Sequence, residues 1–230
     1  MKRVTLTLLT LAFLAIGTTG AIAQQAKAIK VDLSTVTKLK LDVSCKIELT
    51  QSTTPLLAIE ANDEVLNEIT SKVSGGELSI KRDKRNQEQS EVTIYLSIQN
   101  LESIEVVRDV NLEGKGELKF NKLAIKVNGV LTADLNLTTT HFDIHSSGVL
   151  TLTASGKTDV LNLEMPGVGK ANLLNLKVKK ATVEVDGVGK AQVDVSEYLQ
   201  ATVNGVGKIS YKGHPALKLK VSGVGSISEI

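Results

Sequence analysis

Residues 167–230 read GVGKANLLNLKVKKATVEVDGVGKAQVDVSEYLQATVNGVGKISYKGHPALKLKVSGVGSISEI, and the phrase Gly-Val-Gly-Lys or a close variant returns four times in this stretch. Two earlier copies extend the series, whose spacings are 19, 19, 20, 18 and 18 residues. A fixed period of this length is typical of a solenoid, in which each repeat forms one coil stacked on its neighbours. The first glycines of the six copies are Gly129, Gly148, Gly167, Gly187, Gly205 and Gly223.

The repeats predict an all-β, β-helix or solenoid-like stack of coils over residues 101–230. At about 4.8 Å per coil, six coils form a column of roughly 30 Å. We predict four apolar rows inside the stack: Leu163, Val183, Ala201 and Leu219; Met165, Val185, Val203 and Val221; Val168, Val188, Val206 and Val224; and Ala171, Ala191, Ile209 and Ile227. The outer rows are Glu164, Glu184, Thr202 and Lys220, and Asn172, Gln192, Ser210 and Ser228.

The glycines mark the corners of the coils. Apolar residues change from odd to even positions across Pro166–Val168, and back after Gly169. Such a change indicates that the backbone turns, and we predict that glycine supplies a positive φ there.

Residues 24–100 predict a strand-rich region with one short helix, packed on the solenoid so that 24–230 form one structural domain. Strict alternation over residues 39–49 places Cys45 on the buried face of a strand, as a small core residue rather than a reactive thiol. Asn62 is an expected helix N-cap. Val65, Leu66, Ile69 and Val73 follow it at helical spacing.

Residues 1–23 predict a cleaved signal peptide. Lys2 and Arg3 precede a mostly apolar run, and Ala21 and Ala23 form an A-x-A cleavage site. We therefore expect an exported protein, located in the periplasm, on the outer cell surface or outside the cell. No second long apolar stretch follows, so we expect no membrane insertion after cleavage.

The charge balance argues against bulk electrostatic binding. The chain has 27 Lys and Arg residues against 25 Asp and Glu, and the signal peptide carries two of the basic ones. The mature chain is therefore close to neutral, which disfavours nucleic acid as a partner.

One local pattern suggests a binding surface, which we call the lysine ladder: Lys170, Lys190 and Lys208 follow the second glycine of three successive repeats. Stacked coils would project them in one row. The ladder could bind an acidic glycan or a phosphate-bearing polymer, or it could protect an exposed β surface from aggregation.

Residue types for catalysis or metal binding are sparse, so we predict no enzyme, no cofactor and no metal. His141 and His145 would share a strand face about 13 Å apart, too far to hold one metal ion. A weak calcium site near Asp134, Asp143 or Asp159 stays open.

Several segments together resemble the auto-transporter adhesin head domain family, also called the GIN domain, over residues 36–230. They are LKLDVSCKIELTQ, AIEANDEVLNEITSKVSGGELSIK, VTIYLSIQNLESIEVV and the glycine repeats ending GKISYKGHPALKLKVSGVGSI. The resemblance implies a β-helix-like fold and a cell-envelope or extracellular location. It implies no catalytic residue and no known ligand.

The leading hypothesis is a non-enzymatic, adhesin-like envelope protein that presents its solenoid surface to a glycan or to an envelope protein. The alternative is a periplasmic sensing or scaffolding component that forms homo-oligomers through its last coil. A polysaccharide-degrading enzyme is the third hypothesis. The last coil ends at Ser228–Ile230 with no obvious cap, and we expect the chain's own N-terminal strands or a second subunit to cover it.

Overall fold

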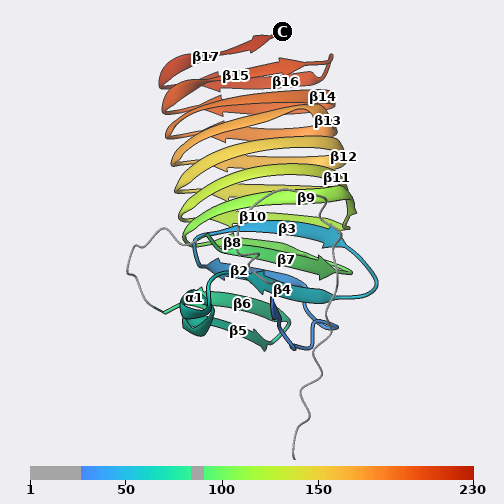
Figure 1. Cartoon of the computed structure of the whole chain (residues 1–230). Helices are drawn as coiled ribbons and strands as arrows, with labels where there is room; N and C mark the ends of the chain where they lie inside the picture. Colours follow the sequence, from blue (N-terminus) through green and yellow to red (C-terminus); the bar gives the residue numbers. More distant parts are fainter. Residues whose placement is uncertain (1–26, 84–90) are drawn as a thin grey trace, which may run out of the picture.

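The computed structural model describes residues 27–83 and 91–230, so the predicted signal peptide lies outside the described residues. About 74% of the structure is strand, arranged as a β-solenoid of about 7 turns (Figure 1). The predicted all-β solenoid with one short helix is confirmed.

The solenoid has two walls that enclose the core. Wall A has the order β5 (Ile69–Ser74), β6 (Glu77–Arg82), β2 (Lys38–Asp42), β8 (Ser103–Val106), β10 (Lys122–Val127), the second halves of β11 (Val130–Ser146), β12 (Val149–Met165), β13 (Val168–Val185) and β14 (Val188–Val203), and β16 (Ala216–Val221). Wall B has the order β1 (Lys27–Ala28), β4 (Leu56–Glu60), β7 (Thr93–Ile98), β3 (Cys45–Gln51), β9 (Asp109–Lys119), the first halves of β11–β14, β15 (Val206–Lys212) and β17 (Val224–Glu229).

Parallel stacking begins before the glycine repeats. The strands β2 and β3 pair in parallel with β8 and β9, and together they already form a coil. Antiparallel strands and α1 (Asp63–Glu68) then close this end of the stack, opposite β17 (Figure 1). The coils therefore grow from a folded N-terminal base.

The helix begins as its cap predicts but ends early. The Asn62 Oδ1 accepts a hydrogen bond from the Val65 backbone N–H at 2.8 Å. Ile69 and Val73, expected on the helix, lie in β5 instead, because that segment pairs antiparallel with β6. In this strand the side chains of Ile69 and Val73 are partly buried and pack against the core.

The single cysteine is buried, as predicted. Cys45 is 9% exposed at the start of β3, and burial raises the pKa of its thiol to about 12. The thiolate is thus a negligible fraction at neutral pH, which is typical of an unreactive core cysteine.

The corner glycines are required by close packing rather than by backbone conformation. Positive φ values occur at Gly75, Gly76, Gly116, Gly156 and Gly213, so the prediction for the first glycine of each repeat is wrong. A Cβ on Gly187 would lie 1.8 Å from the carbonyl oxygen of Gly167, one coil below. Here one backbone lies directly on the next and leaves no room for a side chain.

The predicted third inner row is also wrong. Val168 is 52% exposed, whereas Met165 and Ala171 are fully buried. Odd positions therefore point inward throughout this corner, and glycine occupies the inward positions 167 and 169 where the walls meet. The side chain of Val168 is left on the outside.

The other three rows form the core, except in the last coil. Leu199, Ala201 and Val203 of β14 are fully buried, and they pair in register with Leu217, Leu219 and Val221 of β16. These last three are 43–46% exposed. The prediction that the N-terminal strands cover this coil is wrong, because those strands lie at the opposite end (Figure 1).

Candidate functional site

The lysine ladder stands in register near the start of β13, β14 and β15. Lys170 pairs with Lys190, and Lys190 with Lys208, and all three are exposed. Within residues 27–83 and 91–230, none of them forms an ion pair or a hydrogen bond through its ammonium group. The three lysines therefore form the predicted row, and among the described residues their ammonium groups have no ion-pair partner.

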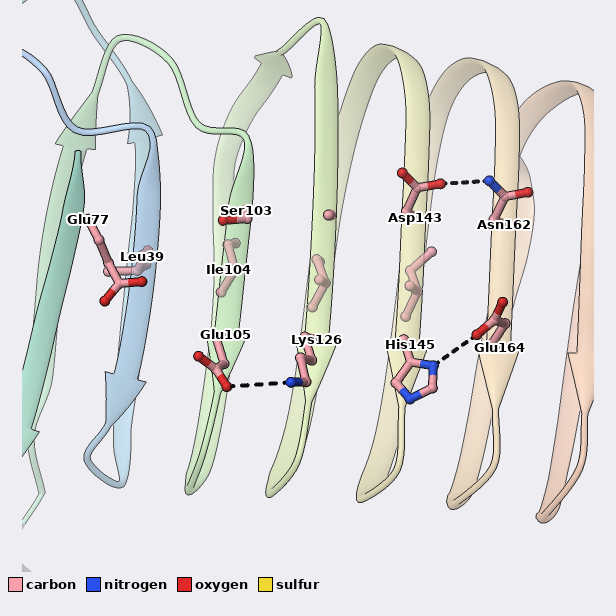
Figure 2. Close-up of a pocket in the computed structure, with 13 residues that line it drawn as sticks. Leu39, Glu77, Ser103, Ile104, Glu105, Lys126, Asp143, His145, Asn162 and Glu164 are labelled. Carbon is pink, nitrogen blue, oxygen red and sulfur yellow. Dashed lines mark hydrogen bonds and ion pairs between the residues drawn. The ribbon is translucent and has the colours of Figure 1, made fainter. Parts of the chain in front are cut away.

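A second surface, the wall A groove, has a volume of about 620 Å³ and lies across β2, β8, β10, β11 and β12 with a contribution from β6 (Figure 2). Outward positions of these strands give it two rows of mainly polar residues, with Ala124 as the apolar exception. One row contains Glu105, Lys126, His145 and Glu164, and the other contains Ser103, Ala124, Asp143 and Asn162.

Neighbouring coils hold the polar groups of the groove in pairs. The Asn162 Nδ2 donates to the Asp143 Oδ1 at 2.7 Å, and the His145 Nδ1 lies 2.9 Å from the Glu164 Oε2 (Figure 2). These pairs fix the side chains. They leave the Asn162 Oδ1 and the His145 Nε2 available for other partners.

The charged end of the groove is held in the same way. The Glu105 Oε2 lies 2.9 Å from the Lys40 Nζ, and the Glu105 Oε1 lies 3.9 Å from the Lys126 Nζ. The groove therefore presents fixed donors and acceptors of both charges.

The row containing Glu164 continues beyond the groove into an acidic group. Burial is the main cause of the raised pKa of the Glu184 carboxyl, followed by the nearby Asp186 and Glu164. The Asn204 Nδ2 donates to Glu184 at 3.1 Å and to Asp186 at 2.7 Å. The side-chain amide of Asn204 therefore bridges the two neighbouring carboxylates of Glu184 and Asp186.

The candidate metal residues do not converge among the described residues, where no group of three His, Cys, Asp or Glu side chains could hold an ion. Asp143 contacts Asn162 and, at 3.5 Å, Lys122. Asp159 pairs with Lys179 at 2.8 Å, and Asp134 lies in β11, where its register partner is Thr153 of β12. The His141 Nδ1 contacts Thr140, while His145 contacts Glu164.

Sequence reasoning identified the outer position of Glu164 but missed the groove. Glu164 pairs in register with His145, His145 pairs with Lys126, and Lys126 pairs with Glu105, so the four residues form one row. The glycine repeat does not extend to β8 and β10, so the repeat signal stops short of the groove's N-terminal half.

Comparison with known families identifies the group to which the chain belongs. A family model described as "Putative auto-transporter adhesin, head GIN domain" matches residues 35–215. The chain belongs to this family. Membership indicates an adhesin-like protein of the cell envelope or the extracellular space. Among curated proteins, no sequence matches the chain.

Solved structures share the GIN-domain fold. The crystal structure of a "putative adhesin" from Bacteroides fragilis NCTC 9343 is 28% identical, with a TM-score of 0.83, and the match covers 90% of this chain and 96% of that one. A "putative lipid binding protein" from Parabacteroides distasonis ATCC 8503 is 20% identical (TM-score 0.62; 90% and 96% covered). A "putative adhesin" from Parabacteroides merdae ATCC 43184 is 19% identical (TM-score 0.68; 90% and 95% covered). The last two likenesses show the fold alone.

None of these names is that of an enzyme. No helix among residues 27–83 and 91–230 has both the length and the apolar character needed to cross a membrane.

Proposed function

We propose that this GIN-domain protein is an exported, non-enzymatic adhesin-like module that binds a neutral glycan in the wall A groove. The observation that carries the proposal is the groove itself, about 620 Å³, whose lining combines eight polar or charged side chains from successive coils with five apolar residues. Export is supported by the signal-peptide pattern of residues 1–23 and by the family.

A neutral glycan suits the groove because sugar hydroxyls both donate and accept hydrogen bonds. Asp143 and Glu164 supply acceptors, Asn162 supplies both kinds of group, and Lys126 supplies a donor. The coil spacing of about 4.8 Å repeats these groups along the stack, as an extended ligand requires. The mixed charges favour a neutral ligand over a strongly anionic one.

Binding to an array of neutral oligosaccharides tests this proposal. We expect the double variant Asn162→Ala/His145→Ala to bind about tenfold or more weakly, since each lost hydrogen bond costs about 0.5–1.5 kcal/mol. The triple variant Lys170→Gln/Lys190→Gln/Lys208→Gln is the matched control and should bind like the wild type. Equal binding by the double variant and the wild type, or no binding by the wild type, would contradict the proposal.

The same experiment addresses the enzyme hypothesis. The groove contains the carboxylates Glu77, Glu105, Asp143 and Glu164, but no arginine is among its lining residues. Three of these carboxylates pair with neighbouring side chains. We expect bound oligosaccharides to release no new reducing ends, and their release would favour a polysaccharide-degrading enzyme.

A second candidate function is scaffolding by self-association through the last described coil. It is favoured by the exposure of Leu217, Leu219 and Val221, whose counterparts one coil below are fully buried. Exposed strand edges with apolar side chains favour pairing with another chain.

Light scattering after size-exclusion chromatography tests this candidate. We expect the wild type to form a dimer at high micromolar concentration, and Leu217→Asn/Leu219→Asn to be monomeric. A wild type that stays monomeric at the same concentration would rule the scaffold out.

A further inference from the structure

We propose that the corner carrying the lysine ladder docks peripherally on an anionic lipid surface. The lysines are accompanied by a row of exposed valines, which we call the valine ridge: Val130, Val149, Val168, Val188, Val206 and Val224. This surface is separate from the wall A groove, so the proposal goes beyond the function proposed above.

The valine ridge is an uninterrupted apolar row. Its side chains are 37%, 42%, 52%, 54%, 52% and 73% exposed, in chain order. Because each valine pairs in register with the next, the ridge runs along five coil spacings, or about 24 Å. Single exposed apolar residues are ordinary, but a contiguous row indicates a surface that meets something less polar than water.

The lysine ladder lies on the same outer face as the ridge. Lys170 is two positions after Val168, and only Gly169 stands between them, so no side chain separates the two outward groups. The same holds for Lys190 and Lys208. In this row Thr132, Thr151 and Ser226 are neutral.

The three ladder lysines flank the middle of the ridge, while carboxylates lie at its N-terminal end, where Asp109 pairs in register with Val130, and on its wall A side. Asp186 precedes Val188 at the corner, and its carboxylate accepts a hydrogen bond from Asn204 at 2.7 Å. The three ladder lysines have no such partner among the described residues. Residues 168–230 contain nine lysines against five Asp and Glu residues, so this C-terminal segment is positive although the mature chain is nearly neutral.

An anionic bilayer accounts for both rows at once. Valine methyl groups can enter the interfacial region, while the long lysine side chains keep their ammonium groups among the lipid phosphates. A soluble anionic polymer would explain the lysines but would leave the valines in water. Each lysine near an anionic surface contributes roughly fivefold to binding, so three contribute about 100-fold.

Co-sedimentation of the mature chain, residues 24–230, with vesicles tests the proposal. One set contains phosphatidylcholine alone and the other a mixture with phosphatidylglycerol. We expect binding to the anionic vesicles, a loss of about 100-fold in Lys170→Gln/Lys190→Gln/Lys208→Gln, and a loss of at least tenfold in Val168→Thr/Val188→Thr/Val206→Thr. Threonine keeps the β-branched shape of valine, and circular dichroism confirms that each variant is folded.

Two control variants make the result specific. Lys72→Gln/Lys157→Gln/Lys180→Gln removes the same net charge at exposed lysines away from the ridge, and it should bind like the wild type. The groove variant Asn162→Ala/His145→Ala should also bind vesicles normally, so failure of the glycan proposal and failure of this one are distinguishable.

Three outcomes would overturn the proposal. The first is no binding of the wild type to anionic vesicles, and the second is an equal loss in the Lys72 control variant and the ladder variant. The third is binding to soluble dextran sulfate that needs the lysines while the valine variant binds vesicles normally, which would assign the ladder to an anionic polymer.

Discussion

The variant Gly187→Ala loses about 3 kcal/mol or more of unfolding free energy, or fails to fold. The added Cβ would lie 1.8 Å from the Gly167 carbonyl oxygen and 2.4 Å from that of Pro166. Neither backbone segment is free to move away, because the Gly187 N–H donates to Met165 and the Val188 N–H donates to Gly167, both at 3.0 Å. Overpacking against fixed backbone lies at the costly end of such changes.

Urea denaturation followed by circular dichroism measures this loss. The matched control is Val188→Thr at the adjacent position, where the side chain is 54% exposed and the change should stay within about 0.5 kcal/mol. If both variants had the same midpoint, the account of the corner glycines would be wrong. A smaller loss of unfolding free energy in Val188→Thr than in Gly187→Ala would also indicate that the valine ridge lies outside the core.

The second large effect is expected at Phe142, the largest fully buried side chain among residues 27–83 and 91–230. In β11 it lies in register between Leu123 and Leu161, both fully buried. Phe142→Ala leaves a cavity between coils and should cost about 3–5 kcal/mol. The same denaturation experiment measures the loss.

The conservative change Phe142→Leu keeps most of the volume and should cost under about 1.5 kcal/mol. A loss below about 1 kcal/mol in Phe142→Ala would show that this coil does not pack as described.

The coil architecture could be predicted because in-register stacking leaves a direct trace in the sequence. Each coil places the same kind of residue above the same position, so Ala171 and Ala191 recur at one period and are both buried. The N-cap at Asn62 and the buried Cys45 were predicted for similar reasons, since each depends on residues close in sequence.

The corners could not be read correctly from residue type. A valine between two glycines has the composition of a core position, yet the glycines face inward and Val168 faces outward. Glycine is compatible with a positive φ and with tight backbone packing, and the sequence does not say which applies. Only the distance between neighbouring coils distinguishes them.

The groove could not be predicted from the sequence because it combines strands that carry the glycine repeat with strands that do not. His145 and Glu164 belong to the periodic coils, whereas Glu105 and Ser103 lie on β8, before the repeats begin. Their alignment depends on the pairing of β8 with β10, for which the glycine phrase carries no signal.

The two proposed surfaces face different partners. The wall A groove lies on one wall, and the valine ridge follows the corner at which the chain passes to wall B. A GIN-domain protein docked by its ridge on a lipid surface would keep the groove accessible to a glycan. This arrangement is consistent with an adhesin-like role at the envelope.

The most direct test of the central claim is an NMR titration of isotopically labelled mature chain with the neutral oligosaccharide that binds best on the array. The account predicts that the amide shifts which change belong to residues 103–106, 122–127, 142–146 and 161–165, the strands that form the wall A groove. It also predicts that amides of the valine ridge stay unchanged. Changes confined to the ridge or to the last coil, or no changes at all, would contradict the assignment of the groove as the glycan site.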